Sequence, residues 1–567
     1  MLKREKIFPL IALLAIVSML LSACGQATPA AEVPVAVNTQ AAAAPAATEV
    51  PAATALPAPT ATPDLSGGVL SLGIGSEPET LDPGDAVYVQ EQLVLINLFD
   101  SLLSTGPDAS LHAGLALSWQ PNADFTEFSF KLRPDVKFHD GTPFTGQAVK
   151  VSFDHIVSAD VLESGGKTLL VDHKYTETVV TDDANVTVKF AASYPTFLRD
   201  AARQWLSISS PTALTKYGKD YGRNPVGTGP FKFVKWDAQS QIVLDRNPDY
   251  NWAPEFAAHQ GPAYLDQVVF RILPEAATRL TALQTGELQV ASEPPALDAI
   301  DLSTSGQAVL KTFAQPGIPA LMMINTEKEP TNDLNVRKAM ILAINQPELA
   351  KTAFKDLGIP SYSVISPTTW SFDEKAANLY RFNLEEAGKL LDESGWKDAN
   401  GDGIREKDGA NLTLDYITSP IWEEAFNELL SGYLQKAGFE VKMRAMDDAG
   451  IASEAGAGNY SFLYMYWTRA DPSPLRILFH SDNIKGGAAY TRFSNLELDK
   501  VLADGDTQTD ETIRKQDYVT AQQIIMENAL ILPLFTVNTV YLLAPSVQNF
   551  SFDLEGYPWI YDISLAK

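Results

Sequence analysis

Hydrophobic and polar residues alternate with period two in several short runs of the chain. In Glu127–Leu132 the residues Phe128, Phe130 and Leu132 are apolar and their neighbours are polar. This alternation is typical of a strand with one buried face. Similar runs, or short apolar stretches, predict further strands at Val69–Ile74, Val186–Phe190, Phe231–Val234, Gln241–Leu244 and Leu412–Ile417.

Three longer segments carry apolar residues at helical spacing, at Leu334–Ala353, Glu423–Ala437 and Thr512–Ala529. In the first segment Val336, Met340 and Ile344 form one apolar stripe, as in an amphipathic helix. Asp333 and Asp510 stand where the N-caps of the first and third helices are expected. Strands and helices are mixed along the chain beyond residue 67 without a second linker. This mixture predicts an α/β assembly whose lobes the chain crosses more than once.

The N-terminus has the pattern of a secretory signal. Three basic residues precede an apolar run of 15 residues, Ile7–Leu21, which is short for a membrane span because a span needs about 20 residues. The run ends in Leu21-Ser22-Ala23-Cys24, which resembles the bacterial lipobox. We therefore predict a lipoprotein signal peptide over residues 1–23 and lipidation of Cys24. The mature protein is expected on the extracytoplasmic face of the cell membrane, in the periplasm or at the cell surface, anchored through that lipid.

Residues 24–66 have the composition of a tether. From Gly25 to Ser66, 28 of 42 residues are Ala, Pro or Thr, and seven of them are prolines that interrupt any helix. The segment offers little apolar side chain to offset the entropy of ordering, so we predict that it is disordered.

Composition excludes several classes of function. The chain has 567 residues with 43 Lys and Arg against 70 Asp and Glu, a net charge of −27, and such an acidic surface repels nucleic acid. A single cysteine excludes a disulfide framework, and the six histidines show no zinc-ligand spacing. We predict that the protein uses no cofactor and is not an enzyme.

One loop has part of a metal-binding pattern. Asp398-Ala399-Asn400-Gly401-Asp402-Gly403 is typical of the first half of a calcium loop, but the twelfth position is Gly409 where the loop needs Glu. A turn between Trp396 and the strand at Leu412 explains the same residues without a metal. We predict no metal site, with calcium as the alternative for this loop.

Distinctive motifs are spread over nearly the whole mature chain. The longest is Phe128–Phe144, and the others, in chain order, are Ser76–Pro83, Leu98–Leu102, Leu115–Trp119, Pro225–Phe231, Asn247–Tyr250, Val336–Ala339, Arg492–Asn495 and Ile531–Phe535. In type and order these motifs resemble the extracytoplasmic solute-binding proteins of ABC importers, in the family of the dipeptide- and oligopeptide-binding proteins (family 5). In the longest motif, which is also the most specific, family members read T-F-x-L-R-x-G-V-K-F-H-D-G-T-P-F; this chain has Pro134-Asp135 at the usual polar-Gly turn.

The resemblance implies a two-lobed periplasmic-binding-protein-like fold of class II, an α/β fold with an extra subdomain in the N-terminal lobe. The first lobe is expected at residues 67–318, with the inserted subdomain at about 112–225, and again at 537–567. The second lobe is expected at 319–536, and the crossing strands at Ile318–Ile324 and Pro533–Val540.

The resemblance also implies where a ligand is bound. In the family's peptide binders a Trp in the strand that corresponds to Tyr464–Thr468 lines the cleft, and an Asp three residues later takes the peptide's α-ammonium group. Here the Trp is Trp467, but the third position is Ala470, and Asp471 follows it. The expected ligand-binding residues are Glu77, Tyr466, Trp467, Thr468, Arg469 and Asp471.

The sequence leaves three hypotheses for the function. The first is a monomeric peptide-binding protein that delivers its ligand to ABC permease subunits with cytoplasmic ATPases. The second keeps the binding module but replaces the peptide by an oligosaccharide or another small organic solute. The third is a secreted acidic hydrolase, for which no motif places two carboxylates at a bond-cleaving distance.

Overall fold

The computed structural model describes residues 65–161, 164–419, 424–508 and 510–566. The predicted signal peptide, Cys24 and all but the last two residues of the predicted tether lie outside the described residues. Residues Asp64–Lys567 form one compact unit. Within the described ranges, no helix has both the length and the apolar character needed to cross a membrane.

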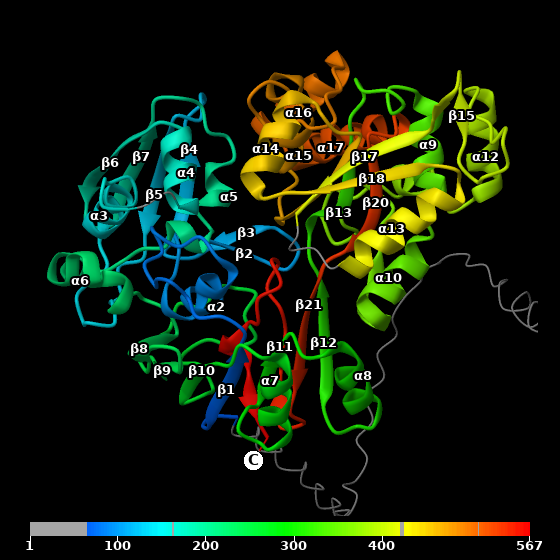
Figure 1. Cartoon of the computed structure of the whole chain (residues 1–567). Helices are drawn as coiled ribbons and strands as arrows, with labels where there is room; N and C mark the ends of the chain where they lie inside the picture. The colour runs from blue at the N-terminus through cyan, green and yellow to red at the C-terminus, as the bar shows by residue number, and fades with distance from the viewer. Residues whose placement is uncertain (1–64, 162–163, 420–423, 509, 567) are drawn as a thin grey trace, which may run out of the picture. The chain divides into compact units, whose positions relative to one another are not determined.

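A seven-stranded sheet forms the centre of the first lobe, called lobe I below (Figure 1). Its first strand pairs in parallel with two neighbours, so the strand that opens the fold lies in the middle of the sheet. The strand order is β12 (Val309–Ala314), β21 (Asn538–Leu543), β11 (Val290–Ser292), β1 (Val69–Ile74), β10 (Gln267–Ile272), β9 (Gln241–Arg246) and β8 (Phe231–Asp237).

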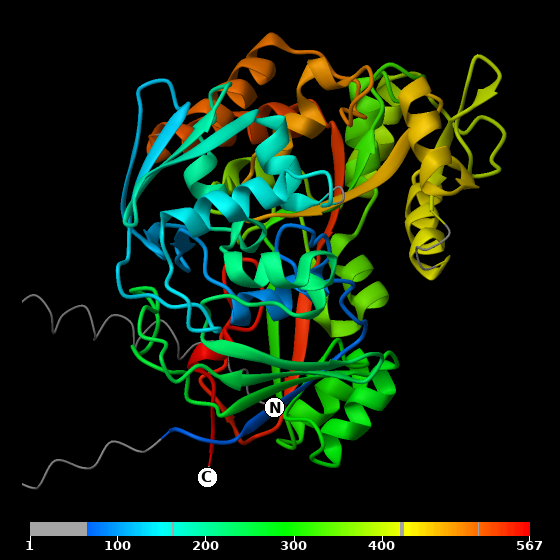
Figure 2. The ribbon, with the colours of Figure 1, turned by 90° about the vertical axis from the view of Figure 1, so that its left-hand side faces the viewer.

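Lobe I carries a subdomain with its own four-stranded antiparallel sheet, whose cyan elements face the viewer in Figure 2. Phe128, Phe130 and Leu132 are buried on one face of its second strand, as the alternation predicts. The sheet order is β4 (Ala116–Pro121), β5 (Glu127–Leu132), β7 (Asn185–Phe190) and β6 (Tyr175–Asp182). The helices of lobe I and its subdomain are α2 (Val89–Leu98), α3 (Gly146–Ile156), α4 (Gly165–Asp172), α5 (Phe197–Asp200), α6 (Pro211–Tyr217), α7 (Ala276–Gln284) and α8 (Ala296–Thr304), with 3-10 turns at Gln204–Leu206, Gly218–Arg223 and Ile560–Asp562.

A six-stranded mixed sheet forms the second lobe, called lobe II. Its order is β14 (Ile359–Pro360), β20 (Ile531–Thr536), β13 (Gly317–Ile324), β19 (Phe462–Thr468), β17 (Thr413–Thr418) and β18 (Glu440–Ala445). Its helices are α9 (Leu334–Leu342), α10 (Gln346–Phe354), α11 (Glu374–Ala377), α12 (Leu384–Glu393), α13 (Glu424–Lys436), α14 (Asp448–Ala457), α15 (Pro474–Phe479), α16 (Leu496–Thr507) and α17 (Glu511–Glu527), with 3-10 turns at Lys355–Leu357 and Ser481–Asn483. Two-stranded ribbons complete the fold: β2 (Leu103–Thr105) with β3 (Leu111–Ala113), β15 (Glu406–Lys407) with β16 (Ala410–Asn411), and β22 (Val547–Gln548) with β23 (Ser564–Leu565).

Strand β13 lies inside lobe II with apolar residues on both of its faces. Met322 and Ile324 pack in one hydrophobic cluster, and Leu321 and Met323 pack in another. The run is therefore apolar throughout instead of alternating, as expected for a strand that helices cover on both sides.

The chain passes twice between the two large sheets. Strand β12 ends at Ala314 in lobe I and β13 begins at Gly317 in lobe II. On the return, β20 ends at Thr536 in lobe II and β21 begins at Asn538 in lobe I (Figure 1). The predicted lobe limits at residues 318 and 536 lie beside these passages and stay predictions.

The predicted helix at Leu334–Ala353 was wrong in one respect, because two helices occupy it. Helix α9 ends at Leu342 and α10 begins at Gln346. Pro347 lacks a backbone N–H, so it is tolerated in the first turn of a helix but not in its interior. The side chain of Asn345 accepts a hydrogen bond from the N–H of Glu348 and caps the second helix. The predicted N-caps Asp333 and Asp510 are both confirmed.

Candidate functional site

Strand β19 directs its residues alternately to a cavity and to the core of lobe II. Tyr466 and Thr468 line the cavity, and the exposed fraction of Tyr466 is 45%. Trp467, between them, packs against the hydrophobic cluster of lobe II and is not among the residues that line the cavity. Alternation along a strand explains why the three residues cannot share one face. The structure therefore brings Tyr466 and Thr468 together and separates Trp467 from them.

Gly317 allows the start of β13 to lie close to β19. Its φ is +99°, in the region that favours glycine, and a Cβ atom there would lie 2.5 Å from the backbone oxygen of Trp467 and from the backbone nitrogen of Arg469. Any other residue would push the end of β19 away from the passage between the lobes. The glycine thus holds the predicted ligand strand, β19, against the start of β13.

The cavity beside β19, called the interlobe cavity, has a volume of about 430 Å³. Lobe I contributes residues of α2 and β11 to its lining, lobe II contributes Tyr466 and Thr468, and the second passage contributes Val537–Thr539. Its charged lining residues are Arg203, Glu293 and Glu555. Most of the other lining side chains are neutral amides, hydroxyls and tyrosines, which suit a ligand that has many hydrogen-bonding groups.

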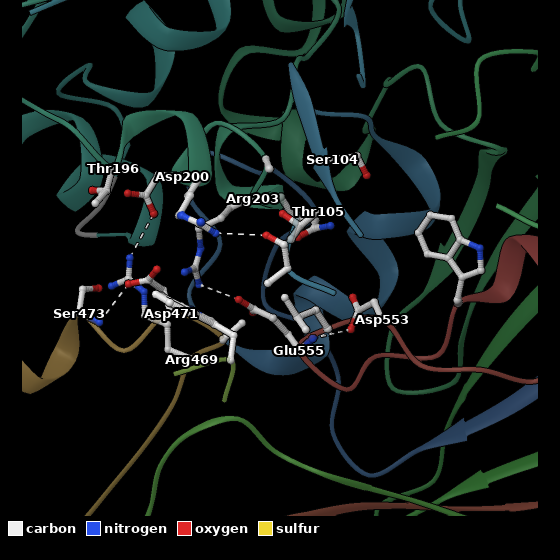
Figure 3. Close-up of a pocket in the computed structure, with 18 residues that line it drawn as sticks. Ser104, Thr105, Thr196, Asp200, Arg203, Arg469, Asp471, Ser473, Asp553 and Glu555 are labelled. Atoms are coloured by element: carbon white, nitrogen blue, oxygen red, sulfur yellow. Dashed lines mark hydrogen bonds and ion pairs between the residues drawn. The ribbon is translucent and has the colours of Figure 1, made fainter. Parts of the chain in front are cut away.

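A smaller pocket of about 110 Å³, called the arginine pocket, meets the interlobe cavity at Arg203, Gln204 and Glu555. Figure 3 shows its charged side chains, with Arg469 of lobe II joined to Asp200 of the subdomain. The Nη2 to Oδ1 distance of this pair is 3.1 Å, and the hydroxyl of Tyr194 donates a hydrogen bond of 2.8 Å to the other oxygen of Asp200. The pocket is therefore lined by side chains of opposite charge from the two lobes.

Two further contacts accompany this pair. Arg199 Nη2 lies 2.5 Å from Glu511 Oε1, so the subdomain also pairs with the first residue of α17. Arg203 Nη2 lies 3.6 Å from Glu555 Oε1, and its guanidinium lies over the ring of Trp205. Glu555 belongs to a loop that Asp553 holds, because the N–H groups of Glu555 and Tyr557 donate to Oδ1 of Asp553. Burial raises the pKa of Asp553 to about 7.

Asp471 lines the arginine pocket, but its carboxylate is already bonded. Arg514 donates to both oxygens, at 2.7 and 2.8 Å, and the N–H of Ser473 donates to Oδ1 at 3.0 Å. Burial alone would raise the pKa of Asp471, but the Arg514 guanidinium holds it well below its usual range. Asp471 therefore stays ionised and joins the end of β19 to α17.

Glu77 lies in a different place from the other predicted residues. Trp236 Nε1 donates to one of its oxygens at 2.7 Å, and the N–H of Gln239 donates to the other at 3.1 Å. Arg223 lies 3.8 Å from the carboxylate and stacks over Trp236. Glu77 thus joins the turn after β1 to the β8–β9 hairpin, and it is not among the lining residues of the interlobe cavity or the arginine pocket.

The sequence did not predict six of the charged residues that line these two cavities: Arg199, Asp200, Arg203, Glu293, Asp553 and Glu555. They belong to three segments far apart in the chain, and none of them stands in a short motif with chemistry of its own. Only the resemblance pointed to this region, and it pointed to the β19 strand alone.

The predicted calcium alternative concerns a loop in lobe II. Carboxylate oxygens of Asp398, Asp402 and Glu406 lie within 4.8 Å of one another. The oxygens of Asp398 also accept hydrogen bonds from the N–H groups of Gly401 and Gly403. These bonds close a turn of the kind that the composition of the loop predicts.

Comparison with known proteins agrees with this geometry. Residues 110–486 match the family described as bacterial extracellular solute-binding proteins, family 5. The chain belongs to this family. The membership makes the protein a solute-binding protein and not an enzyme, so the hydrolase hypothesis is excluded.

The similarity to individual relatives extends over nearly the whole chain. The protein is 26% identical over 505 residues to the probable D,D-dipeptide-binding periplasmic protein DdpA of Escherichia coli, covering 86% of this chain and 92% of the relative. Its fold is similar to that of the oligopeptide-binding protein AppA of Bacillus subtilis in complex with a nonapeptide, with a TM-score of 0.66, 23% identity and coverage of 89% and 100%. It is also similar to NikA of Brucella suis in complex with Fe(III)-EDTA, with a TM-score of 0.72, 22% identity and coverage of 88% and 100%. The family-5 protein thus has the two-lobed fold of periplasmic binding proteins.

Proposed function

We propose that this protein captures peptides between its two lobes and delivers them to the permease of an ABC importer. The observation that carries the proposal is the interlobe cavity, in which Tyr466 and Thr468 of an extended strand face lobe I across the passage. A peptide laid along such a strand finds hydrogen-bonding groups at regular spacing. The names of the relatives support the proposal, since DdpA is named a probable D,D-dipeptide-binding protein and AppA an oligopeptide-binding protein.

We propose that Tyr466 and Thr468 contact the ligand and that Arg469 and Asp471 form the wall of the adjoining pocket. A ligand that contacts both lobes binds the closed state more tightly than the open state, and this differential affinity shifts the population toward closure. Closure is then the signal that the permease subunits and their cytoplasmic ATPases receive. The protein acts as a monomer on the extracytoplasmic face of the membrane, anchored through the lipid on Cys24.

A second candidate keeps the binding module and changes the ligand to an oligosaccharide or another small organic solute. The specific observation in its favour is that NikA, a neighbour in fold, holds Fe(III)-EDTA. The neutral amides and tyrosines of the interlobe cavity suit sugar hydroxyls as well as peptide groups.

Native mass spectrometry of the full-length protein, purified in detergent from its own cells, tests the proposal. We expect a mass increment that fragments into amino acids, because a closed binding protein retains its ligand during purification. Calorimetric titration of the emptied protein with a mixture of defined peptides should then show binding. A retained glycoside or other non-peptide solute, together with no heat from the peptides, would replace the first candidate by the second.

A further inference from the structure

The residues that line the interlobe cavity include two carboxylates and one cation. Of its three charged lining residues, Arg203 and Glu555 pair with each other at 3.6 Å. Glu293 is the third, and the exposed fraction of its side chain is 74%. It forms a loose ion pair with the buried Arg279, whose Nη2 lies 3.9 Å from its carboxylate. The lining residues of the cavity therefore carry one net negative charge, and Glu293 is the more exposed of the two carboxylates.

Glu293 is held in place by its backbone. It follows β11 with a φ of +45°, a conformation that residues other than glycine rarely adopt and that persists only where the surroundings impose it. Its N–H donates to the carbonyl of Val540 in β21, and its carbonyl accepts a bond from Arg279. The same arginine donates to the carbonyls of Leu273, Pro274 and Ser292. The N–H groups of Arg279 thus hold the backbone and leave the carboxylate of Glu293 available.

Gly75 keeps the space in front of this carboxylate open. It also lines the interlobe cavity, directly after β1. A Cβ atom at residue 75 would lie 3.5 Å from Oε2 of Glu293 and 3.2 Å from Nη1 of Arg279. A side chain there would crowd the Glu293 carboxylate and the Arg279 guanidinium, and glycine avoids this contact.

The other carboxylates considered for an ammonium group are already engaged. Residue 470 is an alanine, both oxygens of Asp471 are bonded to Arg514, and Glu77 is bonded to Trp236. On the basis of the proposed peptide-binding function, we propose that Glu293 binds the α-ammonium group of the peptide. The N-terminus of the ligand then lies against lobe I beside Gly75, and the recognition of the amine comes from the end of β11 and not from the turn after β19.

Calorimetry on the full-length protein in detergent tests this inference with paired peptides. A mixture of free peptides of two to five residues first identifies one that binds the wild type, and this peptide is then compared in its free and N-acetylated forms. We expect the wild type to bind the free form at least about tenfold more tightly than the acetylated form, because one charge-assisted hydrogen bond contributes an affinity difference of this size. In Glu293→Gln the two forms should bind alike, at the level of the acetylated peptide on the wild type.

Glu287→Gln is the matched control, because it removes the same charge from lobe I at a residue that does not line the interlobe cavity. We expect it to keep the preference of the wild type for the free peptide. Equal binding of the free and acetylated forms by the wild type, or an undiminished preference in Glu293→Gln, overturns the inference and leaves the proposed function standing. If no peptide in the mixture binds the wild type, the proposed function fails and the inference fails with it.

The comparison within the wild type does not depend on a variant that folds. A thermal melt of Glu293→Gln accompanies the titrations, and Glu293→Asp provides a second variant with the charge retained on a shorter side chain. We expect Glu293→Asp to recover part of the preference for the free amine. A preference that is kept in Glu293→Gln and lost in Glu293→Asp would show that the shape of the side chain, and not its charge, is read, and would overturn the inference.

Discussion

Asp471 and Arg514 form a buried ion pair behind the turn that follows β19. The exposed fractions of the two side chains are 15% and 2%, and the guanidinium of Arg514 also donates to the carbonyl of Gly505. Removing the charge of Asp471 would leave a buried arginine without its partner, which costs much more than the pair itself contributes. The residue has the geometry of a stabilising contact between β19 and α17.

We expect Asp471→Asn to lower the free energy of unfolding by about 3 kcal/mol at pH 7. Because the pKa of Asp471 is lower in the folded chain than its ordinary value of 3.8, the stability that its charge contributes is complete above that value. This stability is lost as the pH falls toward the folded pKa. Urea denaturation at pH 7 and below pH 4 should therefore show the difference between wild type and variant becoming smaller in acid. A constant difference at both pH values would contradict the ion-pair account.

The residues around β19 show how much of the candidate site the sequence predicts. The resemblance directed attention to Tyr466, Trp467 and Thr468, but a strand with period two places neighbours on opposite faces, and only the structure shows which face is the cavity. The partners of Asp471 and Glu77, Arg514 and Trp236, lie 43 and 159 residues away along the chain. No local sequence pattern predicts contacts between residues so far apart in the chain. The sequence therefore predicted both carboxylates as ligand-binding residues, although in the structure they bind other side chains of the protein.

At the scale of elements, helix α5 of the subdomain forms ion pairs with lobe II. Asp200 in this helix pairs with Arg469 at the end of β19, and Arg199 pairs with Glu511 at the start of α17. The Asp200 carboxylate is buried, with 5% of its side chain exposed, whereas the Glu511 side chain is 66% exposed. The first pair is therefore the stronger link between the lobes, since solvent screens the second.

We expect Asp200→Asn to favour the open state of the lobes. Breaking one partner of a buried charge pair costs about 2–5 kcal/mol, and 2 kcal/mol alone changes an equilibrium about 30-fold. Small-angle scattering of the unliganded protein should show a larger radius of gyration than for the wild type, and Glu511→Gln should show a smaller change in the same direction. Asp154→Asn is the control, because it breaks an ion pair inside the subdomain. A folded Asp200→Asn protein with the wild-type radius would show that this pair does not hold the lobes together.

Local pattern predicted the elements well where period and caps agreed. The strand at Glu127–Leu132 and the helix from Glu511 have the predicted type and position. The single helix predicted from Leu334 was wrong because the apolar stripe continues across Asn345 and Pro347, while the backbone chemistry of these two residues ends one helix and begins another. Turn chemistry outweighed periodicity at this point.

At the scale of the whole molecule, the order of motifs predicted more than any element did. The family resemblance along the chain predicted a two-lobed α/β fold, and the comparisons confirm it. The reason is physical, since the motifs occupy turns and core strands, and these determine the connections between sheets. The same motifs do not identify the ligand, because the residues that line the interlobe cavity come from separate segments that meet only in the folded chain.

The predicted anchoring of the molecule depends on one residue, Cys24, the chain's only cysteine. A lipid attached to it would hold a strongly acidic body, with a net charge of −27 for the full chain, near the membrane. We expect Cys24→Ala to abolish lipidation, so that the protein leaves the detergent-rich phase in a phase partition or remains with an uncleaved signal peptide. Ser22→Ala keeps a small residue beside the cleavage site and should partition like the wild type. Recovery of Cys24→Ala in the detergent-rich phase after cleavage would show that the protein is attached to the membrane in another way.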